Sequence, residues 1–291
     1  MIDCSMKINL TLRLTGKRED GYHDLASLFV KIKSGERVLI RENARDVVEM
    51  SGLDIDFTGE NIALKAVRIA RELGADIPAL YIKIFKAVRP GSGLGSGSGN
   101  AAAVIKWLMQ NYNLDKALCL EIARRTGADV PFLFEASQGR EDFNIALVTG
   151  IGEIIRPLNF DFKFKFNYDN YNAEDLEQYS PQDLNFKNFS VDIIRPDWSV
   201  STREAYNALD ENLIKPNLNL NDSEALSEIN LICGKLLNGE RVGLLPNDFY
   251  EFYLAQKYSG YRDIFNKFED AGCIAWGLSG SGSAAFGLKE N

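Results

Sequence analysis

Alternating hydrophobic and polar side chains near the N-terminus predict a first β-strand over residues 7–14 (KINLTLRL). Every second residue from Ile8 is aliphatic, and a period of two places those side chains on one face of a half-buried strand. Lys7 and Asn9 lie together on the other face. Such a polar face usually contacts solvent, but two donors spaced two residues apart would also clamp an anion lying nearby.

The same reading places helices and strands along the rest of the chain. Spacings of two predict strands, and spacings of three and four predict helices. Strands are expected over 25–32, 37–41, 79–88, 144–158 (two strands), 164–168, 193–196 and 273–288 (two strands). Helices are expected over 61–73, 99–112, 115–125, 201–209, 226–237 and 249–271. Pro157 ends the hairpin at 144–158 and favours a domain boundary near residues 156–162.

A glycine-rich stretch at residues 89–103 (RPGSGLGSGSGNAAA) joins the strand at 79–88 to the helical pattern that follows. Side chains this small cannot form a core, so any binding role of the stretch must come from its backbone. Glycine permits positive φ, and N–H groups leading into a helix N-terminus bind anions. A flexible linker is the alternative, but the strand-to-helix context favours a phosphate site. The stretch has neither the lysine of a Walker A loop nor the spacing of GxGxxG.

Asp129 lies in the segment 127–132 (GADVPF), just after the helix predicted at 115–125. Pro131 disfavours the helical conformation at Val130, so we expect Asp129 on a short, stiff connector. A carboxylate just past a helix C-terminus is unfavourably placed, because that end of a helix favours cations. Either Asp129 is exposed and without a role, or a cation elsewhere in the chain holds it.

Two features nearer the C-terminus allow both a structural and a functional interpretation. Ser201 and Glu204 match a capping box, and Thr202 and Tyr206 share a face of the helix that it begins. Taken alone, Tyr206 is typical of core packing. A second Gly/Ser stretch, residues 277–283, is either a tight hairpin or a lid over a phosphate.

Composition narrows the classes of protein. A net charge of −8 disfavours a nucleic-acid surface. The four cysteines have no metal-binding spacing and lie far apart, which favours reduced thiols in the cytoplasm. No signal peptide and no long apolar run is found, so we expect a soluble cytoplasmic protein without a membrane span. With His23 as the only histidine, a metal site built from several histidines is excluded.

The motifs, taken in chain order, resemble those of the GHMP small-molecule kinases. They run from Lys7 to Gly287 and read MKINLTL, GYH, GLGSGSGNAAA, GADVPF, a VST helix start, PND and LSGSGSAAFGL. The glycine loop is common to the whole superfamily, whereas Lys7-Ile8-Asn9, Gly21-Tyr22-His23 and GADVPF are more specific. These more specific motifs resemble those of the branch of the family that phosphorylates the 2-hydroxyl of a cytidine diphosphate-linked methylerythritol.

The resemblance implies an α+β fold of two domains, an ATP-binding domain at residues 1–157 and a second domain at 158–291, with the active site in the interdomain cleft. It implies ATP and Mg²⁺ as cofactors, a small-molecule substrate, and a monomer or homodimer. Asp129 would take the proton of the substrate hydroxyl, with Lys7 beside it. The ATP phosphates would contact Pro90, Gly91, Ser92, Gly93, Leu94, Gly95, Ser96, Gly97, Ser98, Gly99 and Asn100. The substrate would contact Asn9, Tyr22, His23, Thr202 and Tyr206.

The chain also departs from the family pattern. Cys4-Ser5-Met6 precedes Lys7 where the family has Ala-Pro-Ala, and Gly99 stands where the family has a second loop serine. The chain is longer than usual between Phe134 and Leu147, and residues 163–192 follow no pattern of the family.

Two other functions predict different residues at these positions. A GHMP kinase for another alcohol, such as homoserine or mevalonate, would lack the Gly21-Tyr22-His23 signature. A nucleotide-binding protein without catalysis would lack Lys7 or Asp129, and both are present.

Overall fold

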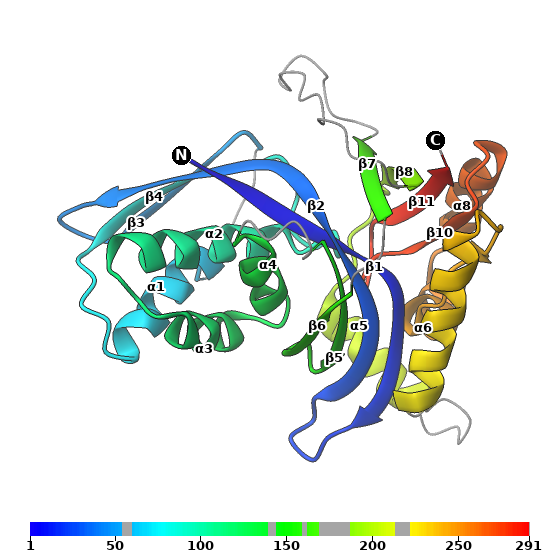
Figure 1. The fold of residues 1–291 in the computed structure, drawn as a ribbon, viewed down its shortest axis with the longest axis horizontal. Coiled ribbons are helices and arrows are strands. Elements are labelled where there is room, and N and C mark those ends of the chain that lie inside the picture. Colours follow the sequence, from blue (N-terminus) through cyan, green and yellow to red (C-terminus); the bar gives the residue numbers. More distant parts are fainter. Residues whose placement is uncertain (54–59, 139–143, 159–161, 169–186, 213–221, 291) are drawn as a thin grey trace. The chain divides into compact units, whose positions relative to one another are not determined.

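The computed structural model describes residues 1–53, 60–138, 144–158, 162–168, 187–212 and 222–290. The chain forms two compact units, which are described separately here. The first contains residues 1–7, 31–90 and 95–158, and the second contains residues 8–30, 91–94 and 159–291. Two long strands, β1 (Ile2–Lys17) and β2 (His23–Glu42), contribute residues to both (Figure 1). The domain division at residues 157 and 158 stays a prediction.

The first unit combines a sheet with four helices. Its strands follow the order β3–β4–β2–β5–β6, and β1 pairs with β2. The new strands are β3 (Val47–Ser51), β4 (Leu80–Phe85), β5 (Ile145–Gly150) and β6 (Ile154–Pro157). The helices pack against one another: α1 (Ile62–Glu72), α2 (Ser96–Asn111), α3 (Lys116–Thr126) and α4 (Val130–Ala136). In Figure 1 they lie on one side of the β2–β4 part of the sheet.

The second unit contains a five-stranded sheet in the order β7–β8–β11–β10–β9, and α8 packs on β10 and β11. Its strands are β7 (Phe162–Tyr168), β8 (Lys187–Ile194), β9 (Gly243–Leu244), β10 (Ala275–Leu278) and β11 (Ala285–Glu290). Its helices are α5 (Thr202–Asn212), α6 (Asp222–Leu237), α7 (Ala255–Lys257) and α8 (Gly260–Asp270), with a π-helical turn at Tyr250–Leu254. The helix predicted over 249–271 is therefore interrupted near Tyr258.

Several predicted elements are confirmed, with shifted ends. Asn61 and Asp115 cap α1 and α3 with their side chains, as expected of residues that accept from first-turn N–H groups. The serine half of the capping box at Ser201 also forms, since the Ser201 hydroxyl accepts from the backbone N–H of Glu204 at 3.3 Å. Of the two segments without a family pattern, residues 139–143 and 169–186 lie outside the described part of the chain.

The expectation that β1 is half-buried is wrong. Lys7, Asn9 and Thr11 are as buried as the aliphatic residues between them, with exposed fractions of 4%, 2% and 1%. The alternation identified the strand correctly, but it could not show that both faces are covered. Polar side chains buried in this way need hydrogen-bond or ion-pair partners.

Two boundaries also differ from the prediction. Residues 25–32 and 37–41 belong to one continuous strand, β2, which passes through Gly35 at a φ of 70°. The segment after α3 is not a connector, because α4 begins at Val130 with Pro131 in its first turn. Proline is compatible with the first turn, since the N–H that it lacks has no partner within the helix.

No helix in the described part of the chain is long and apolar enough to cross a membrane.

Gly99 allows α2 to lie against β1 at very short range. A Cβ at Gly99 would lie only 1.8 Å from the backbone oxygen of Ser5. Gly99 and Ser5 are both positions at which the chain departs from the family pattern. The two departures are therefore in contact, since a side chain at residue 99 would collide with the β1 backbone at Ser5.

We predict that Gly99→Ser, although it restores the family residue, lowers the free energy of unfolding by about 1–3 kcal/mol through overpacking. The matched control is Gly97→Ser on the same helical turn, where a Cβ would meet only the Ile62 side chain at 3.4 Å. That control should change stability by no more than about 0.5 kcal/mol. Urea unfolding of both variants checks this, and equal stability would contradict the packing account.

Candidate active site

The glycine-rich stretch forms a turn that leads directly into α2. Gly91, Gly93 and Gly95 have φ values of 75°, 75° and 67°, a region that side chains disfavour. Gly95 is the N-cap of α2, and no side chain from the described residues caps this end. The first intrahelical donor is the N–H of Gly99, which bonds to the oxygen of Gly95 at 2.9 Å. The preceding N–H groups have no partner within the helix, so this N-terminus can bind an anion.

The second Gly/Ser stretch connects β10 to β11 and packs against the first. The Ser279 hydroxyl donates to the oxygen of Gly93 at 3.0 Å, and the Ala284 N–H donates to the oxygen of Ser92 at 3.0 Å. A Cβ at Gly93 would lie 2.2 Å from the oxygen of Ser279, so only glycine fits there. The stretch forms the predicted hairpin, since β10 and β11 pair antiparallel. It supports residues 92–93 from one side.

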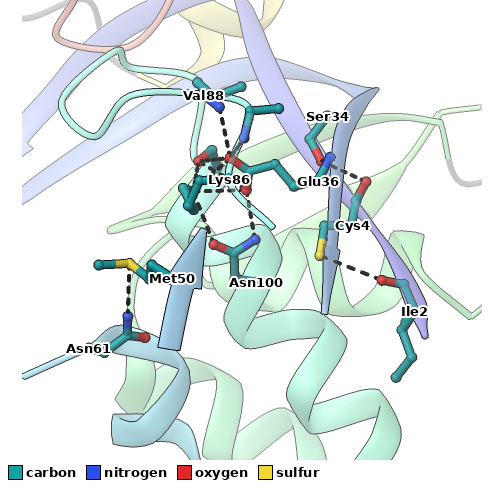
Figure 2. A network of polar contacts seen from close by, with 11 residues as sticks. Ile2, Cys4, Ser34, Glu36, Met50, Asn61, Lys86, Val88 and Asn100 are labelled. Carbon is teal, nitrogen blue, oxygen red and sulfur yellow. Dashed lines mark hydrogen bonds and ion pairs between the residues drawn. The ribbon is translucent and has the colours of Figure 1, made fainter. Parts of the chain in front are cut away.

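A buried carboxylate holds the chain on both sides of the first loop (Figure 2). Glu36 on β2 pairs with Lys86 at 2.7 Å, and their side chains are 0% and 4% exposed. Glu36 also accepts from the N–H groups of Ala87 and Val88, at 3.2 and 3.0 Å, just before the loop. After the loop, the Asn100 side chain donates to Glu36 at 2.7 Å. One carboxylate therefore fixes both ends of the loop.

The Glu36 cluster also decides which way two loop side chains point. The Ser96 hydroxyl and the Asn100 side-chain oxygen both accept from the Lys86 ammonium, at 2.6 and 3.1 Å. Figure 2 shows the Asn100 side chain directed toward Glu36 and Lys86. Ser96 and Asn100 thus hold the loop in shape through their side chains. Because these side chains are engaged with Lys86 and Glu36, the group available to an anion here is the backbone N–H of Ser96.

Lys7 and Asp129 form an ion pair in the first unit, with 3.6 Å between Nζ and Oδ2. Lys7 is 4% exposed, whereas the Asp129 side chain is 28% exposed. This pair meets the start of α2, because a Cβ at Gly95 would lie 3.2 Å from Asp129 Oδ2 and 3.4 Å from Lys7 Cε. The cation, the carboxylate and the anion-binding N-terminus are therefore neighbours.

The surroundings of Asp129 differ from the prediction in one respect. Asp129 directly precedes α4, where the helix dipole favours a negative charge, rather than lying unfavourably after α3. Of the two alternatives left open, the structure has the carboxylate held by a cation, Lys7.

Burial lowers the pKa of Lys7 from its ordinary value, and the Asp129 carboxylate opposes that shift. A buried ammonium needs such a counter-charge to remain protonated. The arrangement costs stability and keeps a positive charge beside the loop, as expected of a functional site.

The five predicted substrate residues all belong to the second unit. His23 is buried, lies 5.2 Å from the ring of Tyr206, and pairs through Nε2 with Asp210 Oδ1 at 2.7 Å. Tyr206 also packs edge-on against Phe249, with ring centroids 4.9 Å apart. The structure therefore brings His23 and Tyr206 together.

The other three predicted substrate residues have distinct surroundings. Tyr22 is 60% exposed. The Asn9 side chain is buried and donates to the Ser27 hydroxyl at 2.9 Å. The Thr202 hydroxyl pairs with that of Ser281, in the second Gly/Ser stretch, at 2.9 Å.

Glu36, Lys86 and Asp210 were missed in the sequence. Lys86 ends a strand-like run immediately before the glycines, and this position was the available signal. Glu36 is 50 residues away along the chain from Lys86, so only the fold brings them together.

Comparison with known proteins defines the class. Residues 61–136 match the GHMP kinases N terminal domain, and residues 224–291 match the GHMP kinases C terminal domain. Together with the loop and the Lys7–Asp129 pair, these matches place the chain among the GHMP kinases.

Full-length relatives narrow the class to one family. The 4-diphosphocytidyl-2-C-methyl-D-erythritol kinase of Chlorobium chlorochromatii is 31% identical, over 98% of this chain and 86% of its own length. That of Bacteroides fragilis is 30% identical, over 97% of this chain and 89% of its own length. A crystal structure of 4-(cytidine 5'-diphospho)-2C-methyl-D-erythritol kinase shares the fold, with a TM-score of 0.69, 24% identity, and coverage of 99% of this chain and 89% of that one. The chain belongs to the 4-diphosphocytidyl-2-C-methyl-D-erythritol kinase family.

We predict that Lys7→Met abolishes phosphoryl transfer but leaves the protein at least as stable as the wild type at pH 7. Because the folded protein lowers the pKa of Lys7 from 10.5, the unfolded chain binds more protons at this site between the lowered value and 10.5. The wild type therefore gains stability at this site as the pH rises through that interval, and Met does not.

The measurement is urea unfolding of both proteins at pH 7 and pH 10. The stability advantage of Lys7→Met should be larger at pH 7 and shrink at pH 10. A variant clearly less stable than the wild type at pH 7 would show that Lys7 stabilises the fold, contrary to this account.

Proposed function

We propose that this chain transfers the γ-phosphate of ATP to the 2-hydroxyl of 4-diphosphocytidyl-2-C-methyl-D-erythritol, in the non-mevalonate pathway to isoprenoid precursors. The observation that carries the proposal is the contact of the Lys7–Asp129 pair with Gly95, the N-cap of α2. Phosphoryl transfer requires an anion site, a cation and a group that orients the attacking hydroxyl. These three requirements are met by neighbouring residues of one unit.

The ATP phosphates fit the loop at residues 90–100. Positive φ at three glycines and the uncapped N-terminus of α2 give a backbone cradle without side chains in the way. ATP, when bound there, supplies the γ-phosphoryl group. Glu36 and Lys86 keep the two ends of the loop in place, so little reorganisation is needed on binding.

In this proposal Asp129 accepts the proton of the substrate hydroxyl, and Lys7 stabilises the negative charge on the transferring group. Asp129 is the more exposed of the two and can reach a substrate. Lys7 is held in a buried position, where its charge interacts more strongly than it would in water.

We propose that Mg²⁺ enters with the ATP phosphates. Among the described residues, no group of three or more His, Cys, Asp or Glu side chains could hold a metal ion. Magnesium in nucleotide sites needs only one or two carboxylates besides phosphates and water, and Asp129 lies beside the loop. A single carboxylate beside the loop is enough for a Mg²⁺ ion that binds together with the nucleotide phosphates.

The substrate residues are proposed on the resemblance, supported by their surroundings. An exposed Tyr22 can stack on a base, which contributes about 1–3 kcal/mol per base. His23 and Tyr206 lie against each other and would line the cytosine site, with Asn9 and Thr202 nearer the polyol and diphosphate. We further propose a cytoplasmic monomer or homodimer. The location is supported by four buried cysteines without disulfides.

The experiment is a coupled ADP-release assay with three alcohols: 4-diphosphocytidyl-2-C-methyl-D-erythritol, homoserine and mevalonate. We expect activity on the first alone. Activity confined to homoserine or mevalonate would contradict the substrate assignment, and ATP binding without ADP release from any of them would favour a non-catalytic protein.

Asp129→Asn is the matched variant for this assay. It should retain ATP and substrate binding but reduce turnover by about 10²–10⁴-fold, the usual contribution of a positioned base. A variant with full turnover would remove Asp129 from the proposed role.

A further inference from the structure

We propose that Asp210 is a specificity-determining positioning residue, which holds His23 with Nδ1 as a hydrogen-bond acceptor for the 4-amino group of cytosine. The inference rests on the proposed function, because that function places His23 in the cytosine site. The inference adds to that function a residue of α5, Asp210, which selects the base by positioning His23.

The contacts that position His23 come from α5 and, through Asp210, from the end of β1, all in the second unit. His23 Nε2 lies 2.7 Å from Asp210 Oδ1, and its side chain is 2% exposed. The other carboxylate oxygen of Asp210, Oδ2, lies 2.8 Å from the Lys17 ammonium at the end of β1. Tyr206, one turn before Asp210 on α5, packs against the His23 ring. The ring is therefore fixed on one edge by Asp210 and on one face by Tyr206.

This arrangement determines where the proton of the ring resides. An ionised carboxylate can only accept, so Nε2 must donate, and the remaining nitrogen of a neutral imidazole, Nδ1, is an acceptor. Burial disfavours ionisation of Asp210, but hydrogen bonds from Lys17 and His23 hold its pKa below the ordinary value.

A neutral ring with an acceptor at Nδ1 distinguishes the two pyrimidines. Cytosine presents an amino donor at position 4, whereas uracil presents an oxygen acceptor there. Nδ1 can accept a hydrogen bond from the cytosine amino group. Opposite the uracil oxygen, Nδ1 would be one of two acceptors facing each other. A correctly matched polar contact of this kind contributes roughly 10- to 100-fold in selectivity.

Asp210→Asn should switch the tautomer of the His23 ring, and not only weaken its hydrogen bond. The Lys17 ammonium only donates, so the amide oxygen of Asn will face Lys17 and the amide NH₂ will face His23 Nε2. Nε2 then becomes the acceptor, and Nδ1 carries the proton. The matched control is Asp24→Asn, which removes the carboxylate of the residue next to His23, a carboxylate that pairs with Arg18 on the same β1–β2 hairpin.

Two readouts test the proposal. His23 is the only histidine, so the ¹⁵N spectrum of histidine-labelled protein reports its tautomer without assignment. We expect the proton on Nε2 in the wild type and in Asp24→Asn, and on Nδ1 in Asp210→Asn. The ratio of kcat/KM for the cytidine substrate to that for its uridine analogue should fall by roughly 10- to 100-fold in Asp210→Asn alone.

An unchanged tautomer in Asp210→Asn, or an equal loss of activity on both substrates, would overturn the proposal, because a purely structural role affects both bases alike. A wild type inactive on the cytidine substrate would instead overturn the proposed function. If Asp210→Asn does not fold, Lys17→Met replaces it, since half of that side chain is exposed. Without the Lys17 ammonium, Asp210 loses the partner that holds its second carboxylate oxygen, so His23 is held less firmly and the cytidine preference should fall. An unchanged preference would count against the proposal.

Discussion

The buried carboxylate of Glu36 connects the strand that enters the glycine-rich loop with the helix that leaves it. The loop itself has almost no side chains with which to hold a conformation, and glycine carries the largest entropy cost of ordering. Lys86 neutralises Glu36, and hydrogen bonds from both flanks occupy both of its oxygens. Breaking a buried pair of this kind by removing one partner typically costs about 3–5 kcal/mol. The shape of the glycine-rich loop therefore depends on Glu36 and Lys86, which lie outside it.

The Lys7–Asp129 pair has the opposite character. Burial lowers the pKa of Lys7, so the ammonium is retained at a cost to stability. Its carboxylate partner is only partly buried and remains accessible. The structure thus separates two tasks: Glu36 and Lys86 stabilise the loop, whereas Lys7 and Asp129 are available for chemistry. Gly95 contacts the second pair, and its successor Ser96 contacts the first, so the two tasks meet at the N-terminus of α2.

Local patterns in the sequence were sufficient for most helices and strands and for the position of the glycine-rich loop. Alternation identified β1, glycine spacing identified the loop, helical spacing identified α1 and α3, and the capping serine Ser201 marked the start of α5. The predictions that were wrong concern features that depend on tertiary structure. The burial of both faces of β1 cannot be read from its own residues, and Pro131 is ambiguous between a helix start and an extended connector. The partners Glu36–Lys86 and His23–Asp210 are separated by long stretches of chain, and no local pattern links them.

The central claim is that this chain phosphorylates one hydroxyl of a cytidine diphosphate-linked polyol. The most direct measurement is ³¹P and ¹³C NMR of the product formed from ATP and 4-diphosphocytidyl-2-C-methyl-D-erythritol with the purified protein. The account predicts one new phosphomonoester, coupled to carbon 2 of the erythritol unit, in an amount equal to the ADP formed. Phosphate on a different hydroxyl, or ADP formed with free phosphate and unchanged polyol, would contradict it.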